Sequence, residues 1–326
     1  MGPAAPETPL TDPLRPATDK IMTMREAIAA YVHDGDTVCL EGFTHLIPTA
    51  AGHEIIRQRR KNLTVVRMTA DIVVDQMLAA GCVTKLVSSF VGNSSAGSLG
   101  ELRRRIESGV PEPLAFEEYS HYGMVGRYLA GAQRLPFYPL RSYAGSDLPS
   151  VNPAIRKVAS PYADTSEEPE QLYVVPPVRP DVTIIHAQRA DLRGNTQVWG
   201  LTGVQAEAVF AARRAVVVVE EVVSEDVVRS DPNRTIIPAH VVDAVVECPW
   251  GAHPSFAQGY YDRDNGFYRN WSQISKDSDR LRSWMSEWIH GTRDHAEYVA
   301  KLGADMRSRL AVGEALSLPV NYGRRR

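Results

Sequence analysis

The chain has 326 residues, of which 44% are hydrophobic and 23% are charged, and its formal net charge is −3. This composition is typical of a globular protein with one large or two modest domains, and it gives no general electrostatic attraction to nucleic acid. Cys39, Cys82 and Cys248 are widely spaced and form no CxxC pair. Their number and spacing argue against a disulfide framework or a zinc site and for a reducing compartment.

The two ends of the chain differ from the middle. Residues 1–20 carry acids and prolines where a secretory signal needs a basic start and an apolar core, so they predict a disordered leader. No uninterrupted apolar run approaches the roughly 20 residues needed to cross a bilayer. We therefore expect a cytoplasmic protein with no membrane segment, one domain over residues 21–310 and a tail over residues 311–326.

In the first half, predicted helices and strands alternate. Thr23 can cap a helix over residues 24–32, and Gly81 can end a later one. The elements in order are helix 24–32, strand 37–40, helix 49–59, strand 63–68, helix 71–80, strand 85–91 and helix 99–108. This alternation predicts the α/β class, with an open, mainly parallel sheet and helices on both faces.

The second half begins less regularly. Residues 116–140 predict a short strand, a helix through Ala132 and a return, and residues 141–180 form a long excursion without clear periodicity. The further elements are strand 182–186, helix 204–212, strand 215–223, a strand within 241–249 and an amphipathic helical region over 278–302. Two basic clusters, 57–61 and 103–105, lie in helix-period segments and are interpreted as solvated helix faces.

Two loops between a strand and a helix could face a ligand. In the first, a buried strand leads into Gly42, Phe43 and Thr44, where a glycine permits close backbone approach and free helix N–H groups can bind an anion. An ordinary turn is an equally good interpretation, because a dinucleotide fingerprint needs three glycines. In the second loop, GNSSAGS over residues 92–98, the alternative is a capped helix start.

The sequence lacks the motifs that several kinds of catalytic chemistry require. The sequence has no GxSxG elbow, no Walker loop and no GxGxxG, and its nine histidines do not group at metal spacing. We therefore expect neither a metal nor a nucleotide cofactor. Carboxylates remain as candidates, because Glu41 ends a strand beside the glycine loop and Glu118 stands near the start of the FEEYSHYG segment. A glutamate at a strand end beside a glycine loop could attack an acyl group as a nucleophile, while a hydrogen-bonded loop anchor is the favoured interpretation of each carboxylate.

Three long motifs resemble one of the two subunits of the glutaconate-type CoA-transferases, their α subunit. The motifs are DGDTVCLEGFT, PDVTIIHAQRADLRGNTQVWG and VVDAVVECPWGAHPSFAQGYYDRDN, and they lie in family order within residues 22–303. The resemblance implies an open α/β domain that pairs with a separate β subunit in an α₂β₂ or larger assembly. The usual reaction moves CoA between carboxylic acids through a glutamyl-CoA thioester on the β subunit, so the CoA ester is a substrate and no cofactor is needed.

The resemblance also assigns site residues. Gly42, Phe43 and Thr44 match the family's GGFT segment near the acyl group or the CoA, and Ser94, preceded by Asn93, matches a serine that contacts the substrate carboxylate. Glu41 stands where the family has its first glycine. That side chain would narrow the cleft and add a carboxylate, which argues against carrying the glutaconate substrate over to this chain.

Two other functions stay open on the same resemblance. A steroid-ring-opening hydrolase that cleaves a C–C bond of a CoA thioester also resembles this family, and there Glu118 or Glu41 would be the general base. A non-catalytic acyl-CoA-binding chain is the remaining alternative, and it ranks last because the site loops are in place.

Overall fold

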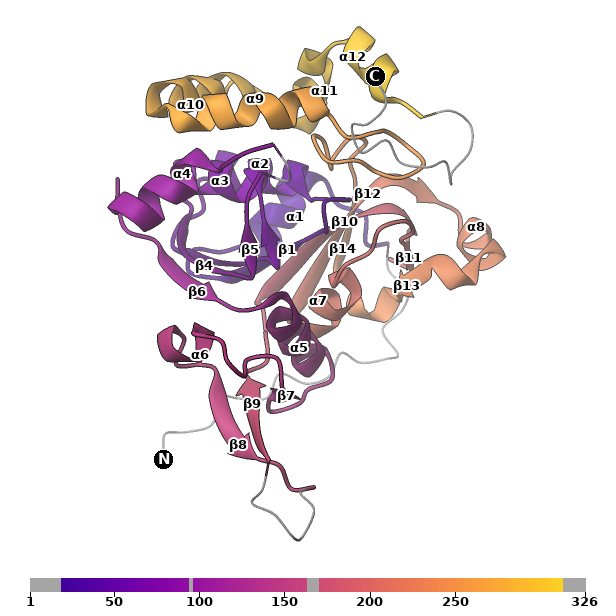
Figure 1. The fold of residues 1–326 in the computed structure, drawn as a ribbon. Coiled ribbons are helices and arrows are strands. Elements are labelled where there is room, and N and C mark those ends of the chain that lie inside the picture. The colour runs from indigo at the N-terminus through magenta and orange to yellow at the C-terminus, as the bar shows by residue number, and fades with distance from the viewer. Residues whose placement is uncertain (1–18, 94–95, 163–169, 313–326) are drawn as a thin grey trace.

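The computed structural model describes residues 19–93, 96–162 and 170–312, and its centre is a nine-stranded sheet (Figure 1). The strand order is β13-β11-β10-β1-β2-β4-β6, with β12 beside β10 and β14 beside β12. All of the pairs are parallel except those of β11 with β10 and with β13. The strands are β1 (Thr37–Glu41), β2 (Leu63–Val66), β4 (Val83–Ser88), β6 (Ala115–Glu118), β10 (Val182–Asp191), β11 (Thr196–Gln197), β12 (Arg214–Val223), β13 (Thr235–Ile237) and β14 (Ala244–Glu247).

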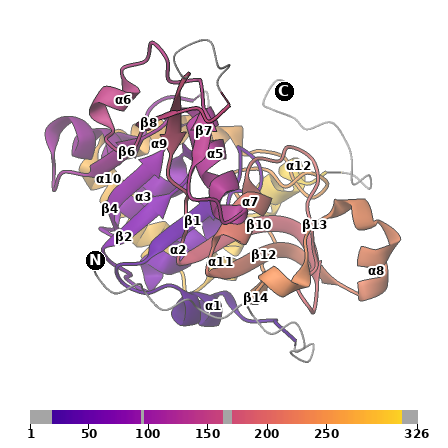
Figure 2. The ribbon, with the colours of Figure 1, turned by 90° about the horizontal axis from the view of Figure 1, so that it is seen from below.

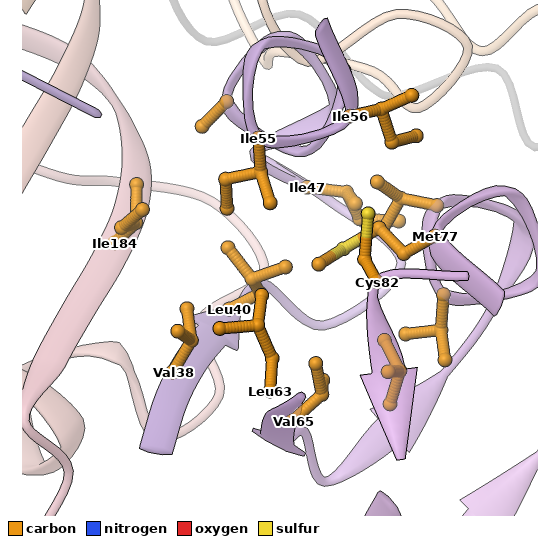
Figure 3. Close-up of a cluster of buried hydrophobic side chains, with 14 of the residues drawn as sticks. Val38, Leu40, Ile47, Ile55, Ile56, Leu63, Val65, Met77, Cys82 and Ile184 are labelled. Carbon is orange, nitrogen blue, oxygen red and sulfur yellow. The ribbon is translucent and has the colours of Figure 1, made fainter. Parts of the chain in front are cut away.

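Successive residues of the central strands point to opposite faces, and both faces are buried. On one face, Val38 and Leu40 of β1 join Ile184 of β10 in a core with side chains such as Ile55 (Figure 3). The first helices of this core are α1 (Met24–Tyr31), α2 (Thr49–Arg57), α3 (Ile72–Ala79) and α4 (Gly100–Arg103), and helices near the end of the chain add to it. Hydrophobic runs such as that of β12 are typical of parallel strands covered on both sides.

The opposite face is covered by α5 (His121–Ala132) and α7 (Gln205–Ala211). Cys39, which lies between Val38 and Leu40 in the sequence, packs here against Tyr128 of α5 and Ala208 of α7. The predicted α/β class, with a mainly parallel sheet and helices on both faces, is therefore confirmed.

A second layer of helices lies over α2, α3 and α4 (Figure 1). It is built from α9 (Asn265–Lys276), α10 (Ser278–Met285), the π-helical turn Ser286–His290, α11 (His295–Leu302) and α12 (Ala304–Leu310). The predicted amphipathic region 278–302 belongs to this layer. Its aromatic residue Trp284 packs edge-on against the buried Trp271, so the apolar face of this region forms part of the core.

The excursion 141–180 contains structure that the sequence pattern does not reveal. Strands β8 (Arg156–Ala159) and β9 (Gln171–Val175) join β7 (Tyr138–Leu140) in an antiparallel sheet, order β7-β9-β8, with the short helix α6 (Leu148–Val151) beside it (Figure 2). Three-residue to five-residue strands between prolines carry too little periodicity to be predicted.

Some predicted elements are divided in the structure. The strand predicted over 85–91 is β4 followed by β5 (Phe90–Val91), which pairs with β3 (Thr69–Ala70) in a sheet of its own. The helix predicted over 99–108 is α4 followed by the π-helical turn Arg104–Ser108. The remaining elements are α8 (Glu225–Ser230) and the 3₁₀ turns Pro232–Arg234 and Ala239–Val241.

The interpretation of the two basic clusters as solvated faces is wrong for one arginine in each. Arg57 reaches the carbonyls of Ile289 and Thr292 in the second helical layer, both at 3.1 Å. Arg105 is buried and binds the Glu101 carboxylate at 3.0 Å. In both places the helix face that carries the arginine is covered by another part of the chain.

All three cysteines are buried and unpaired. In the part of the chain that the structure describes, no helix is long and apolar enough to cross a membrane. Most of the predicted leader and tail, as well as Ser94, lie outside the described residues. At the predicted leader's end, the Lys20 amide donates to the Leu192 carbonyl at 3.0 Å.

Candidate functional site

The candidate site lies where neighbouring parallel strands end. Strands β1, β2, β4 and β6 are adjacent and parallel, so the loops that follow their carboxyl ends meet at one edge of the sheet. This is the edge at which open α/β sheets bind ligands. Three connections meet there, namely the 42–48 loop after β1, the 67–71 connection after β2 and the 88–93 segment at the end of β4.

The 42–48 loop turns sharply at Gly42. A Cβ atom there would lie 2.4 Å from the Leu46 carbonyl oxygen, so no side chain fits without moving the backbone. Thr44 and Leu46 adopt φ angles of 56° and 53°, in the left-handed region. The amide N–H groups of Phe43 and Thr44 have no acceptor among the described residues. Consecutive free amides in such a turn can form an anion-binding concavity.

His45 joins the 42–48 loop to Leu201 and to the 256–258 segment. Its ring is fully buried, stacks on Phe256 and binds the Leu201 carbonyl through Nδ1 at 2.8 Å. Nε2 accepts a hydrogen bond from the main-chain N–H of Gln258 at 3.0 Å, so the proton of the neutral ring belongs on Nδ1. Burial lowers the pKa of His45 to about 4. His45 is therefore a neutral anchor of the loop.

The Glu41 carboxylate points into the protein. It is 1% exposed, and its Oε1 atom accepts the Tyr128 hydroxyl at 2.5 Å and the Met68 amide at 2.7 Å. Burial raises the pKa of Glu41, while the nearby Arg67 charge and these hydrogen bonds oppose the increase. This geometry favours the loop-anchor interpretation of Glu41 over the nucleophile.

Arg67 lies beneath the 42–48 loop and is completely buried. Its guanidinium donates to the carbonyls of Leu40 at 2.5 Å and Gly42 at 3.0 Å, and to the Asp71 carboxylate at 2.8 Å. Burial raises the pKa of Asp71, and the Arg67 charge opposes that increase. The sequence motifs select neither Arg67 nor Tyr128. The one signal is an arginine closing an apolar strand, where a charge needs partners.

Asn93 anchors the 88–93 segment to the second helical layer. Its side-chain nitrogen donates to the Tyr268 carbonyl at 2.7 Å and to the Ser272 hydroxyl at 3.1 Å. Asn93 is 1% exposed, so the amide is used inside the chain. The predicted substrate contact of Ser94 stays a prediction, since that residue is outside the described part.

Glu118 and the rim of the site are exposed. Glu118 ends β6 with an exposed side chain, and its carbonyl accepts the Asn152 side chain at 2.8 Å. His121 follows at the start of α5, with its ring centroid 6.4 Å from that of Phe43 and 6.4 Å from that of Phe90. The half-exposed Phe90 and the partly buried Phe43 thus form an aromatic rim around His121.

The described residues contain no group of three or more metal-binding side chains. The site therefore offers two free amides in a tight turn, an aromatic rim and an exposed carboxylate, above the buried ion pair of Arg67 and Asp71. Such a wall can bind an acyl group and stabilise an oxyanion. Within this chain, no described Ser–His pair is hydrogen-bonded as a nucleophile and base would be.

Comparisons with known proteins agree with this architecture. The coenzyme A transferase family matches residues 21–248. The α subunit of the 3-oxoadipate CoA-transferase of Pseudomonas knackmussii is 50% identical over 283 residues, which are 87% of this chain and 98% of that protein. The cholesterol ring-cleaving hydrolase IpdA subunit of Rhodococcus jostii is 29% identical, over 88% of this chain and 97% of that protein.

A solved structure extends the likeness to three dimensions. The crystal structure of glutaconate coenzyme A-transferase from Acidaminococcus fermentans superposes with a TM-score of 0.85 at 33% identity, covering 93% of this chain and 98% of that chain. The likeness to this enzyme covers nearly the whole chain, and it therefore includes the loops at the carboxyl edge of the sheet. Because the family match, the sequence identity and the common architecture agree, this chain belongs to the coenzyme A transferase family.

Proposed function

We propose that this chain is the α subunit of a two-subunit CoA-transferase that moves CoA between dicarboxylic acids, with 3-oxoadipate as the first acceptor to test. The observation that carries the proposal is the 50% identity to the corresponding subunit of a 3-oxoadipate CoA-transferase, over nearly the full length of both chains. Burial of Glu41 against Tyr128 and Met68 supports the assignment of the nucleophile to a partner chain. A carboxylate that is already used inside the protein is a poor nucleophile.

In the proposed reaction, the acyl thioester carbonyl carbon is attacked by a glutamate carboxylate of the β subunit. The C–S bond breaks, which leaves an acyl-glutamyl anhydride and the CoA thiolate. The thiolate then attacks the glutamyl carbonyl, releasing the first carboxylic acid and leaving a glutamyl-CoA thioester. The second acid reverses these steps and leaves as its CoA ester.

This chain would supply the electrostatic part of the reaction. The Phe43 and Thr44 amides would donate to the oxyanion that forms on the thioester carbonyl. Removing one donor of this kind typically lowers kcat by about 10²–10³-fold. The aromatic rim of Phe43, Phe90 and His121 would cover the acyl chain and exclude water. Excluding water matters because the anhydride and the glutamyl thioester both hydrolyse.

The test is reconstitution with the β subunit. We expect the complex, but not either chain alone, to transfer CoA from succinyl-CoA to 3-oxoadipate. Hydroxylamine added with the acyl-CoA should inactivate the complex and convert one glutamate of the β subunit to its hydroxamate, found by peptide mass spectrometry. Turnover by this chain alone, or a complex that transfers CoA yet resists hydroxylamine, contradicts the proposal. Light scattering of the same complex tests the proposed α₂β₂ or larger assembly.

A second function rests on Glu118. The likeness to a cholesterol ring-cleaving hydrolase subunit spans 88% of the chain, and Glu118 is an exposed carboxylate at the end of a strand in the same edge of the sheet. In this alternative, the present chain would carry the base that activates water for C–C cleavage. Loss of activity in an assembled Glu118→Gln complex, without hydroxylamine sensitivity, favours hydrolysis, whereas an unchanged transfer rate favours the first function.

A further inference from the structure

Arg67 holds two carbonyls of one strand end. Its guanidinium donates to the Leu40 and Gly42 carbonyls, which flank Glu41, while Asp71 binds the same guanidinium at 2.8 Å. A guanidinium is planar, so partners that share it are fixed in direction as well as distance. Arg67 therefore fixes the directions of the Leu40 and Gly42 carbonyls, as well as their positions.

The orientation of the Gly42 carbonyl also decides where the Phe43 amide points. These two groups belong to one peptide unit, and among the described residues the only cis peptide bonds precede Pro111 and Pro254. In a planar trans peptide the C=O and N–H bonds point in opposite directions. Because Arg67 draws the Gly42 carbonyl into the interior, the Phe43 N–H is directed away from Arg67.

The same connection holds the second loop of the site. The Met68 carbonyl accepts the amides of Ser89 at 3.1 Å and Phe90 at 3.2 Å. The Ala70 carbonyl accepts the Gly92 amide at 3.0 Å. The 67–71 connection thus binds the 42–48 loop on one side and the 88–93 segment on the other.

An ion pair this deeply buried needs a reason other than stability. Arg67 is 0% exposed and Asp71 is 4% exposed. Desolvation of two charges commonly offsets their attraction, so a buried pair is weak support for stability by itself. Two carbonyls of a site loop on the same guanidinium point to a geometric role.

We propose that Arg67, held by Asp71, is a positioning residue that aims the Phe43 amide at the acyl carbonyl and couples the 42–48 loop to the 88–93 segment. The first part rests on the proposed transferase function, and the coupling does not. Lysine at position 67 keeps the charge but has one nitrogen, so it cannot hold both carbonyls and Asp71 in the same geometry. In such a variant the Gly42 carbonyl and the Phe43 N–H of the 42–48 loop would no longer be held in one direction.

The first experiment compares Arg67→Lys with Arg105→Lys in the reconstituted complex. Arg105 is a matched control, because it is buried and binds a carboxylate four residues away and one main-chain carbonyl, that of Leu78, outside the site loops. We expect Arg67→Lys to lower kcat on the order of 100-fold with KM changed less than about threefold, as for a donor misplaced by about 1 Å. Arg105→Lys should change kcat less than about twofold.

The second experiment needs no activity. Hydrogen–deuterium exchange is measured by mass spectrometry on the full chain, in whatever complex it purifies. Arg67→Lys should speed exchange in peptides covering both residues 42–48 and residues 88–93, and Arg105→Lys should leave both peptides unchanged. If Arg67→Lys does not fold, Asp71→Asn replaces it, with the same direction of change expected in both experiments.

The outcomes separate the two proposals. If the wild-type complex transfers no CoA, the proposed function fails, and the exchange experiment still decides whether the loops are coupled. If the variant and the control have the same kcat, or if exchange changes in neither or only one loop, then Arg67 is a structural ion pair and the positioning role is overturned.

Discussion

The carboxylate of Glu41 accepts the Tyr128 hydroxyl and the Met68 amide at a single oxygen, Oε1. Glutamine keeps this oxygen and the same volume but cannot act as a nucleophile or a general base. We therefore expect Glu41→Gln to retain more than about half of the wild-type kcat. We expect Glu41→Ala to be less stable by about 1–3 kcal/mol, because it leaves the buried Tyr128 hydroxyl and Met68 amide without their acceptor.

The measurement compares kcat and urea unfolding for the two Glu41 variants. Tyr128→Phe serves as the control, since it removes the hydroxyl and leaves the carboxylate. It should lower stability less than Glu41→Ala and should leave kcat near that of Glu41→Gln. An inactive Glu41→Gln complex with normal stability would mean that Glu41 takes part in the chemistry and is not a loop anchor.

The residues of the candidate site differ in how far the sequence alone identifies them. Gly42 could be identified as a glycine between a strand and a helix, and the structure shows that its turn leaves no room for a Cβ atom. Arg67 and Tyr128 could not, because their partners on β1 and at Gly42 just after it lie 25 to 27 and 87 to 89 positions away along the chain. Such pairs depend on the order of strands in the sheet, and no local pattern encodes that order.

Among the elements, α3 is joined to its two neighbours by one side chain. Asp75 of α3 is fully buried. Its carboxylate accepts hydrogen bonds from the main-chain amide of Leu102 in α4 at 2.8 Å and from the indole N–H of Trp271 in α9 at 3.0 Å. Burial raises the pKa of Asp75 to about 6, although both hydrogen bonds oppose the increase. The three helices therefore share a carboxyl group whose pKa is raised to about 6.

Asp75→Asn should lower the free energy of unfolding by about 1–3 kcal/mol at pH 7, because the new amide group faces the indole N–H as a second donor. Trp271→Phe removes that indole donor. In a double-mutant cycle followed by urea unfolding, Asp75→Asn with Trp271→Phe should be more stable than the sum of the two single losses predicts. Strict additivity would show that the hydrogen bond between these helices contributes nothing.

The elements also divide by how well the sequence predicts them. Long hydrophobic runs such as β12 and capped helices such as α1, where Thr23 and Glu26 form a capping box, were predicted close to their observed bounds. The strands β3 and β11 were not predicted, since two residues carry no period, and β5 was predicted only as the end of one longer strand over 85–91. Strands β3 and β5 lie in the 67–71 and 88–93 connections of the candidate site, so part of that site's backbone is among the least predictable of the chain.

For the molecule as a whole, buried neutral histidines link stability to pH. Burial lowers the pKa of His45 to about 4 and that of His295 to about 3, and it holds the pKa of His53 well below its usual value. In the unfolded chain these rings titrate near pH 6.5. Between pH 6.5 and about 4 the unfolded state therefore binds more protons than the folded state, and stability falls as the pH falls.

Each of these histidines can contribute a slope approaching about 1.4 kcal/mol per pH unit below pH 6.5. Urea unfolding between pH 7 and pH 5 should show the loss. His295→Gln should reduce the slope, whereas His33→Gln should not, because the His33 side chain is 62% exposed. Asp75 acts in the opposite direction below its folded pKa, so the comparison of each variant with wild type is the decisive quantity. Equal slopes in all three proteins would contradict the prediction.

The placement of the three cysteines makes the folded chain resistant to alkylation. Only the thiolate reacts with maleimides, and burial raises the pKa of Cys39, Cys82 and Cys248 far above neutral. Any labelling in native buffer must therefore pass through an opened state. Cys39 belongs to the core that α5 and α7 cover, whereas Cys82 and Cys248 belong to the core on the opposite face of the sheet. The intrinsic thiols thus report the opening of both faces, with no reporter group to introduce.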